Sequence, residues 1–582
     1  MASSASQDLF SFSQHLTSFT AILLVAFVGF IGLYFRLLPK AIQGIPHNES
    51  SKRSILGDIP KIAAYLKKYK DPYKWMATQC QEMKSPLVQV WMKPLQGPTL
   101  ICTDYREAQD VLTRRTKEFD RSEFFSEVFD NTIGHATISM KTDDKFRTLR
   151  RALADTMSHT FINTVAAIQV YDASAALVEL WKAKRELANG RPVRLAHDLE
   201  ISLFDAMWAS VFGNQLRSAD IMKNALRQST DASSSNKDEP ITFPEGEIDP
   251  IVNAVGVITH STEAALASPL PWLTHWIVCK VTAARGALNY KHKVIAQRIA
   301  ESRAKYAAKS GGDSPAMKSV VDCVLRQEEK SLKKGEAGLS DVFLEDELMA
   351  FLIGGHETTA SVFQWGVKYL SDNPQIQRDL RNAVESGLNI ARTDPSYTIL
   401  PTPESILETP IPYLDAVIEE MLRVGAVASG ISRQATVDTT LLGYRIPKGT
   451  EIFFPNMGPC FKAPAIPVDE NKRSASSRER KGKVGEWDTN DIEDFKPERW
   501  LKEDEKGEVR FDINAGPNMP FSAGIRGCFG KRLAYAEAKL LLTLIVLNFD
   551  LRPVPPELGS YDADVMFTRT PQQCYVRLGE IA

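Results

Sequence analysis

The sequence has few cysteines, and no two of them are spaced as a metal-binding pair. Seven cysteines occur in 582 residues, and none form the C-x-x-C spacing typical of zinc sites. A sparse, odd-numbered set also argues against a disulfide framework and is consistent with a reducing compartment. By default each cysteine is expected to be a small buried side chain, at positions 80, 102, 279, 323, 460, 528 and 574.

The sequence also lacks a charge imbalance and an internal repeat. The net charge of −2 gives no electrostatic reason to expect nucleic acid as a partner. Hydrophobic residues make up 43% of the chain and charged residues 24%, which is ordinary globular composition. We therefore expect a protein with a large core.

Charged residues are missing from the N-terminal segment. No Asp, Glu, Lys or Arg occurs between Asp8 and Arg36, and the densest apolar run is "FTAILLVAFVGFIGLYF". With its neutral neighbours this run reaches the roughly 20 residues needed to span a bilayer. A signal peptide would have a basic start and a small-residue cleavage site, and neither is present. The run therefore predicts a membrane anchor, with a buried hydrophobic hairpin as the alternative.

The order of segments predicts a division of the chain. Residues 1–18 would form a short lumenal N-terminus, 19–38 the transmembrane anchor, 39–60 a hinge and 61–582 the main body. Lys and Arg occur only after the run, so the positive-inside rule places the body in the cytosol. "LVQVWM" and "TLICT" predict a hairpin, whereas most patterns from 105 to 381 are helical. The body should be mainly α with small β-sheets, and the charged stretch "DENKRSASSRERKGKVGEWDTND" a solvated loop.

One cysteine lies in a distinctive setting near the C-terminus. Phe521, Gly524, Arg526, Cys528 and Gly530 form the pattern F-x-x-G-x-R-x-C-x-G, directly before an apolar helical run. Glycines allow close backbone approach, and amides at a helix start favour a thiolate. Such a thiolate is a good axial ligand for haem iron, and Arg526 could pair with a haem propionate. A buried cysteine at a helix start is the alternative.

A second pattern, "LIGGHETTAS", lies inside a predicted helix from about 344 to 371. Gly354 and Gly355 each cost a helix about 1 kcal/mol relative to Ala, so a local requirement is expected. A zinc-protease motif would need H-E-x-x-H, but position 360 is Ala. For Thr358 the alternative to a functional role is a hydrogen bond to its own helix.

A third pattern, "YLDAVIEEMLRV", has apolar residues at the spacing of one helical face. Glu420 and Arg423 stand three residues apart on a different face, where an isolated ion pair contributes only a few tenths of a kcal/mol. "FKPERW" follows and contains Arg499.

These four patterns follow one another along the chain in the order typical of the cytochrome P450 superfamily, and the chain resembles these haem-thiolate monooxygenases, of the membrane-anchored eukaryotic type. The resemblance extends from the anchor to the C-terminus. It implies the cytochrome P450 fold, preceded by a single N-terminal transmembrane helix. It also implies haem b as cofactor, with Cys528 as the thiolate ligand of the iron.

The resemblance implies further residue roles. Thr358 would hydrogen-bond bound oxygen, and Glu357 would feed protons through it. Glu420, Arg423 and Arg499 would form a structural network behind the haem.

Two more arginines are expected to hold propionates. Arg433 follows the E-x-x-R helix, and Arg150 stands where the family reads W-x-x-x-R, with Phe146 in place of Trp. Arg151 competes with Arg150 for this role, and surface salt bridges are the alternative for all of them.

Family resemblance implies that substrate contacts come from five places: near 124–140, 250–290, the Gly354 helix, the segment after Arg423, and "MFTRTP". The segment "VGAVASGISR" has only small or aliphatic side chains apart from its polar end, which favours a bulky apolar substrate. The run "ASPLPWLTHWIV" at 267–278 could dip into the membrane, with an ordinary core contact as the alternative.

The predicted function is a monooxygenase that inserts one oxygen atom from O2 into a lipophilic substrate, for example by hydroxylation or epoxidation, in secondary-metabolite biosynthesis. NADPH-derived electrons would come from a flavoprotein reductase in the same membrane, expected to be the endoplasmic reticulum. Two alternatives are a reductase-independent isomerase or dehydratase and a non-catalytic haem-binding sensor. The Glu357–Thr358 pair argues against both, because neither requires a proton relay.

Overall fold

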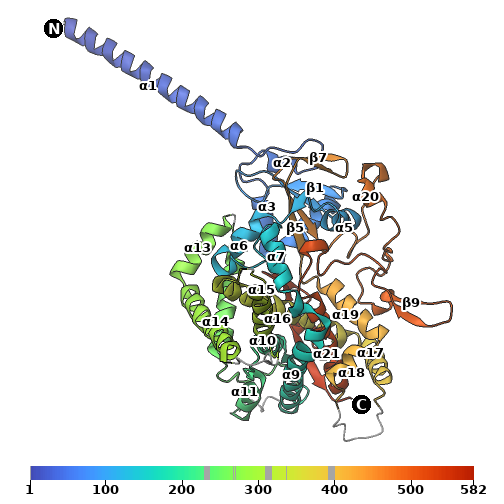
Figure 1. Cartoon of the computed structure of the whole chain (residues 1–582). Coiled ribbons are helices and arrows are strands. Elements are labelled where there is room, and N and C mark those ends of the chain that lie inside the picture. Colours follow the sequence, from blue (N-terminus) through green and yellow to red (C-terminus); the bar gives the residue numbers. More distant parts are fainter. Residues whose placement is uncertain are drawn as a thin grey trace.

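The computed structural model describes residues 2–228, 236–266, 268, 270–308, 317–335, 337–390 and 400–581. Ala267 and Pro269, in the predicted membrane-facing run, lie outside these residues. The N-terminal helix α1 (Ala2–Leu37) projects away from a mainly helical body (Figure 1). It is one continuous helix of 36 residues and begins well before the predicted anchor.

Two described helices are long and apolar enough to cross a membrane, Phe19–Leu37 and His159–Ala188. None of the first is buried in the structure, whereas half of the second is buried inside the body. The second is therefore a core helix, and α1 is the candidate span.

The body is built mainly from helices. Their bounds are α2 Glu49–Lys52, α3 Ile59–Tyr69, α4 Pro72–Glu82, α5 Tyr105–Thr113, α6 Glu123–Ile133, α7 Asp144–Ala152, α8 His159–Phe161, α9 Ala167–Ala188, α10 Ala196–Phe212, α11 Ser218–Ala225, α12 Pro250–Leu266, α13 Pro271–Val281, α14 Ala283–Ala308, α15 Val320–Lys333, α16 Asp341–Asp372, α17 Pro374–Gly387, α18 Pro403–Glu408, α19 Pro412–Gly425, α20 Ala475–Arg478 and α21 Lys531–Asn548.

The strands are short. They are β1 Leu87–Val90, β2 Thr99–Cys102, β3 Phe119–Asp120, β4 Val193–Arg194, β5 Gly430–Ala435, β6 Thr439–Leu441, β7 Tyr444–Ile446, β8 Glu451–Pro455, β9 Leu501–Glu503, β10 Val509–Phe511, β11 Asp550–Arg552, β12 Ala563–Val565, β13 Arg569–Pro571 and β14 Tyr575–Gly579. The largest sheet has the order β1-β2-β8-β5-β3. The predicted hairpin is β1–β2, with Val88 opposite Ile101. A mainly α body with small sheets is therefore confirmed.

Helix α16 passes through the middle of the body and belongs to two hydrophobic clusters. Phe363 and Trp365 pack with α9, α19 and α21, whereas Phe351 and Leu352 pack with α6, α10 and α12. The helix begins after Ser340, whose hydroxyl accepts the Phe343 N–H. Because it is buried along most of its length, it can hold side chains at fixed positions in the interior.

The charged stretch at 469–491 is mostly exposed loop, as predicted, but a few buried side chains anchor it to the body. Arg473 is buried and pairs with Asp104 at 2.6 Å and Glu107 at 3.2 Å, both on or next to α5. Trp487, farther along, is buried against Trp500. Charge composition alone could not reveal the acidic partners, which lie more than 360 residues away in the sequence.

Candidate active site

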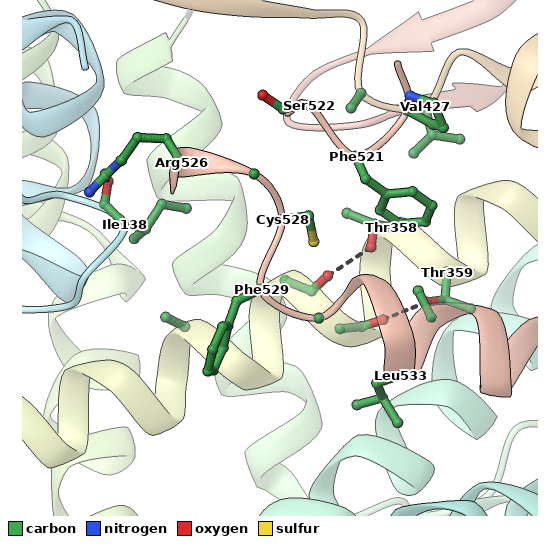
Figure 2. Close-up of a pocket in the computed structure, with 18 of the residues that line it drawn as sticks. Ile138, Thr358, Thr359, Val427, Phe521, Ser522, Arg526, Cys528, Phe529 and Leu533 are labelled. Carbon is green, nitrogen blue, oxygen red and sulfur yellow. Dashed lines mark hydrogen bonds between the residues drawn. The ribbon is translucent and has the colours of Figure 1, made fainter. Parts of the chain in front are cut away.

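A cavity of about 390 Å³ lies between the middle of α16 and the segment before α21. Its wall is mostly apolar, and the Cys528 side chain forms part of it. Figure 2 shows the loop that carries Cys528 facing the part of α16 that carries Thr358 and Thr359. The structure thus brings together two of the predicted motifs, which are separated by 170 residues in the sequence.

The Cys528 loop is fixed by its own backbone and by a close approach to α5. The Cys528 N–H donates to the Phe521 carbonyl at 2.9 Å. Gly524 has φ +69°, and a Cβ there would lie 2.0 Å from the Leu112 carbonyl oxygen, so only glycine fits. A Cβ on Gly530 would meet nothing within 4 Å, so the structure shows no steric reason for that glycine.

Opposing effects act on the Cys528 thiol. Burial raises its pKa, while the N–H groups of Gly530 and Lys531 and the charge of Arg150 lower it. The amides at the start of α21 therefore lower the pKa of the thiol, as predicted. In the protein alone the opposite effect of burial is larger. Iron coordination would deprotonate the thiol outright.

Arginines from four separate segments border the cavity. Arg526 donates to the Thr137 carbonyl at 3.2 Å, and Arg433 donates to the carbonyl of Ser432. The pKa of each is lowered to about 10, mainly by burial, and the charge of Arg526 contributes to the lowering at Arg433. The segments are the β3 end, α7, β5 and the Cys528 loop, which carry Arg121, Arg150, Arg433 and Arg526.

Three of these arginines have buried nitrogen atoms with no partner in the described residues: Arg121 Nε, Arg433 Nη2 and Arg526 Nη1. Buried cationic donors without a partner are unfavourable, and an anionic oxygen atom close to them would stabilise them. The propionates of haem would supply such oxygen atoms, so the residues present fit the cofactor. Sequence reasoning missed Arg121, although a lone basic residue in the aromatic stretch "FDRSEFF" was a signal.

Arg150 and Arg151 have different surroundings in the structure. Arg150 lines the cavity, stacks 3.9 Å from the Phe529 ring centre and donates to the Gly527 carbonyl at 3.1 Å. Arg151 is exposed and contacts its own helix. Phe146, in the place of the expected Trp, lies 4.0 Å from the Arg526 guanidinium and supports it by packing.

The two threonines of α16 both reach the cavity wall. The Thr358 hydroxyl donates to the Gly354 carbonyl at 2.7 Å, which is the predicted bond to its own helix. Glu357 is not among the lining residues, and its Oε1 accepts from the Thr568 hydroxyl at 3.0 Å. Burial, and then the negative charges of Glu263 and Glu200, raise the pKa of Glu357 to about 8.

A second acid–hydroxyl pair, which sequence reasoning missed, lines the cavity. Thr359 Oγ1 lies 2.9 Å from Glu537 Oε2 and 2.8 Å from the Gly355 carbonyl. One hydroxyl proton cannot serve both acceptors, so a bond to the carbonyl requires Glu537 to be the donor and hence protonated. Burial raises the pKa of Glu537 to about 8. The signal was a glutamate on the apolar face of the helix 531–548.

The adjacent glycines Gly354 and Gly355 of α16 differ in what surrounds them. A Cβ on Gly354 would meet nothing within 4 Å. A Cβ on Gly355 would lie 2.5 Å from the Met207 sulfur and methyl, and Met207 also lines the cavity. Gly355 therefore provides room for a side chain of α10.

Four of the five expected substrate regions line the cavity. They contribute Phe125, Gly354, Val427 and Phe567, among others. None of the described residues of 250–290 belongs to this wall. Small and aliphatic side chains after Arg423 do face it, as the sequence indicated.

The predicted network behind the cavity is fully formed. Arg423 makes two bonds with Glu420, at 2.7 and 2.8 Å, and donates to the carbonyls of Phe461, Ile492 and Asp494. Glu420 also accepts from Arg499 and from the Trp500 indole. The Glu420 and Arg423 side chains are completely buried.

Comparisons with known proteins agree with this geometry. The cytochrome P450 family model matches residues 55–459 and 487–576. The chain is 34% identical over 571 residues to cytochrome P450 monooxygenase GME11363 of Pestalotiopsis microspora, covering 97% of this chain and 99% of the relative. It is 32% identical over 576 residues to cytochrome P450 monooxygenase TRI13 of Fusarium sporotrichioides, covering 94% and 97%.

Among solved structures, the crystal structure of the cytochrome P450DA heme domain superposes with a TM-score of 0.66 at 19% identity, covering 94% of this chain and 99% of that one. Fold, family match and relatives lead to one conclusion. The chain belongs to the cytochrome P450 family and is a haem-thiolate monooxygenase, using haem with a cysteine thiolate ligand, O2 and NADPH-derived electrons supplied through a reductase.

Proposed function

We propose that Cys528 is the haem-iron ligand and that the chain oxidises a lipophilic organic substrate in the cavity above it. One observation carries this assignment. Among the described residues, Cys528 is the one cysteine on the cavity wall, and unpaired arginine nitrogens surround the same cavity. Arg121, Arg150, Arg433 and Arg526 would hold the propionates.

Two predicted motif residues have packing roles in this proposal. Phe521 lines the cavity and packs 5.2 Å from the Tyr535 ring, which fixes the start of the Cys528 loop against α21. Gly524 allows the loop to approach α5. Gly530 remains part of the proposed haem-binding motif, although a Cβ at this position would meet no atom within 4 Å.

Haem, when bound, supplies the activation of dioxygen, and the protein must deliver protons to the same cavity. We assign that delivery to Thr358, with Glu357 as the acid behind it. The Thr358 hydroxyl is at the wall, and the raised pKa of Glu357 leaves a proton on this carboxyl at neutral pH. Thr359 and Glu537 offer a second proton-holding pair at the wall.

The substrate is proposed to be bulky and apolar, because Val427, Ala428 and Ile431 present only aliphatic groups to the cavity. The similarity to fungal monooxygenases supports a role in secondary-metabolite biosynthesis.

The membrane arrangement remains a proposal and rests on exposed apolar surface. The span Phe19–Leu37 is exposed throughout, and on α13 the Trp272 and Trp276 side chains are about half exposed. We propose residues 1–18 as lumenal, 19–38 as the anchor, 39–60 as the hinge and 61–582 as the monooxygenase domain in the cytosol, at the endoplasmic reticulum.

Product analysis tests the proposed function. Membranes from cells with and without the chain would be supplied with an NADPH-dependent flavoprotein reductase, and their extracts compared by mass spectrometry. The expected result is a product heavier by one oxygen atom that depends on NADPH and is absent with Cys528→Ser. A rearranged product formed without NADPH would instead indicate an isomerase or dehydratase. Ligand-induced spectral changes without any product would indicate a sensor.

A further inference from the structure

Two carboxyl groups from different helices meet at one short segment near the C-terminus. The Thr568 hydroxyl donates to Glu357 Oε1 on α16 at 3.0 Å. The Phe567 N–H makes a long contact of 3.5 Å with Glu263 Oε1 on α12. Because adjacent residues contact one oxygen of each carboxyl, Glu263 and Glu357 lie beside the same piece of backbone.

The second oxygen of each carboxyl has no partner in the described part of the chain. Glu263 Oε2 and Glu357 Oε2 are both buried, and neither has a hydrogen-bond partner among the described residues. The Glu263 side chain is more than nine-tenths buried. The titratable groups that act on the pair are Glu200 of α10, which accepts from Gln364 at 2.8 Å, and His260 of α12.

Because the two carboxyl groups are buried close together, the state in which both are ionised is disfavoured. An isolated carboxylate is expensive to bury, and two neighbouring carboxylates cannot both ionise easily. Burial raises the pKa of Glu263, and His260 and the Phe567 N–H oppose this. The pKa of Glu357 is raised to about 8, first by burial and then by Glu263. At neutral pH the pair therefore retains at least one proton.

We propose that Glu263 is a positioning residue for the monooxygenase reaction, which shares a proton with Glu357 and keeps that carboxyl protonated beside Thr358. The proposal rests on the proposed role of Glu357. Glu357 would release one proton toward Thr358, and Glu263 would then take up a proton from water and pass it to Glu357. These steps transfer protons only, and no group is oxidised or reduced.

The first test is infrared titration of the ferric, haem-loaded full-length protein, which needs no turnover. The carbonyl band of a protonated Glu357 is the band that Glu357→Gln removes, and its midpoint is expected near pH 8. Glu263→Gln should move this midpoint to lower pH by about one unit, because a neighbouring negative charge is gone. Glu263→Asp keeps a carboxyl group and should move the Glu357 midpoint less. This variant replaces Glu263→Gln in the test if the amide variant folds poorly.

Glu200→Gln is the matched control, since Glu200 already has a partner in Gln364 and affects Glu357 less than Glu263 does. A shift in this control as large as that of Glu263→Gln would overturn the proposal, as would an unmoved midpoint in Glu263→Gln.

The second test is the pH profile of the ratio of product formed to NADPH consumed. As the pH rises through the pKa of Glu357 the proton is lost and the ratio should fall. In Glu263→Gln this fall should begin at lower pH, by the same shift as the infrared midpoint. An infrared shift with an unchanged ratio profile would make the pair structural and refute the relay. Failure of the proposed function is distinguishable, because the wild type itself would then give no NADPH-dependent product.

Discussion

The Glu420–Arg423 network and the polar side chains around the cavity are two buried polar networks, and they differ in one respect. Every side-chain nitrogen and oxygen of Glu420 and Arg423 is paired, although both side chains are completely buried. Around the cavity, by contrast, Arg433, Arg526 and Glu537 each keep a buried polar atom without a partner in the described residues. A satisfied network stabilises the fold, whereas an unsatisfied one indicates a place for a ligand or a proton.

The largest effect should come from breaking the satisfied network. Arg423→Leu would remove one of the two arginines that pair with the buried Glu420 and would leave three carbonyls without their donor, which should cost about 3–5 kcal/mol of the free energy of unfolding. Since a whole domain is stable by only about 5–15 kcal/mol, little folded protein should accumulate. Chemical denaturation measures the loss in the free energy of unfolding.

The control for Arg423→Leu is Arg445→Leu, which removes the exposed pair with Asp438. This change should cost much less stability than Arg423→Leu, because solvent screens an exposed pair. Equal losses in the two variants would show that the buried network has no special role in stability.

Cys528→Ser should abolish activity and leave the fold intact. A serine oxygen cannot replace the electron-rich sulfur, so the long-wavelength Soret band of the reduced carbon monoxide complex should disappear. The six other cysteines lie outside the cavity wall, and Cys460→Ser is a suitable control that should keep the band. If the Cys528 variant keeps the band and a different cysteine variant loses it, the assignment of the ligand is wrong.

Thr358→Ala should lower product formation without lowering stability. The hydroxyl bonds only to its own helix within the described residues, and Ala is a better helix former than Thr. NADPH consumption should continue while hydrogen peroxide rises, and the ratio of product to NADPH should fall by about tenfold or more. An unchanged ratio would exclude this hydroxyl from proton delivery, and Thr359→Ala would then test the second pair.

Arg433→Leu should have the smallest effect on the free energy of unfolding, in contrast to Arg423→Leu. Removing a buried cation with an unpaired nitrogen should leave the haem-free protein as stable or more stable. Haem should bind about tenfold more weakly, because one charge-assisted hydrogen bond is lost. Haem transfer to apomyoglobin measures the second effect. If the haem-free variant is strongly destabilised instead, the distinction between the two networks fails.

Local patterns predicted the α16 helix, the buried face of α19, the β1–β2 hairpin and the Cys528 loop, because each depends on neighbours within a few residues. The position of Arg121, the Thr359–Glu537 bond and the docking of Arg473 on α5 depend on contacts between distant segments. The parallel pairing of β2 with β8 is of the same kind. No periodicity in the sequence carries such information.

Gly355 and Met207 have a consequence for how this cavity can change. The side chain of Met207 fills the room that the missing Cβ leaves, and an unbranched methionine adapts its shape readily. Replacing it with a smaller or larger residue would alter the cavity from α10 while the backbone of α16, and with it Thr358, stays in place. A lineage of such enzymes could thus acquire new substrates through one mutation while its oxygen chemistry is inherited unchanged.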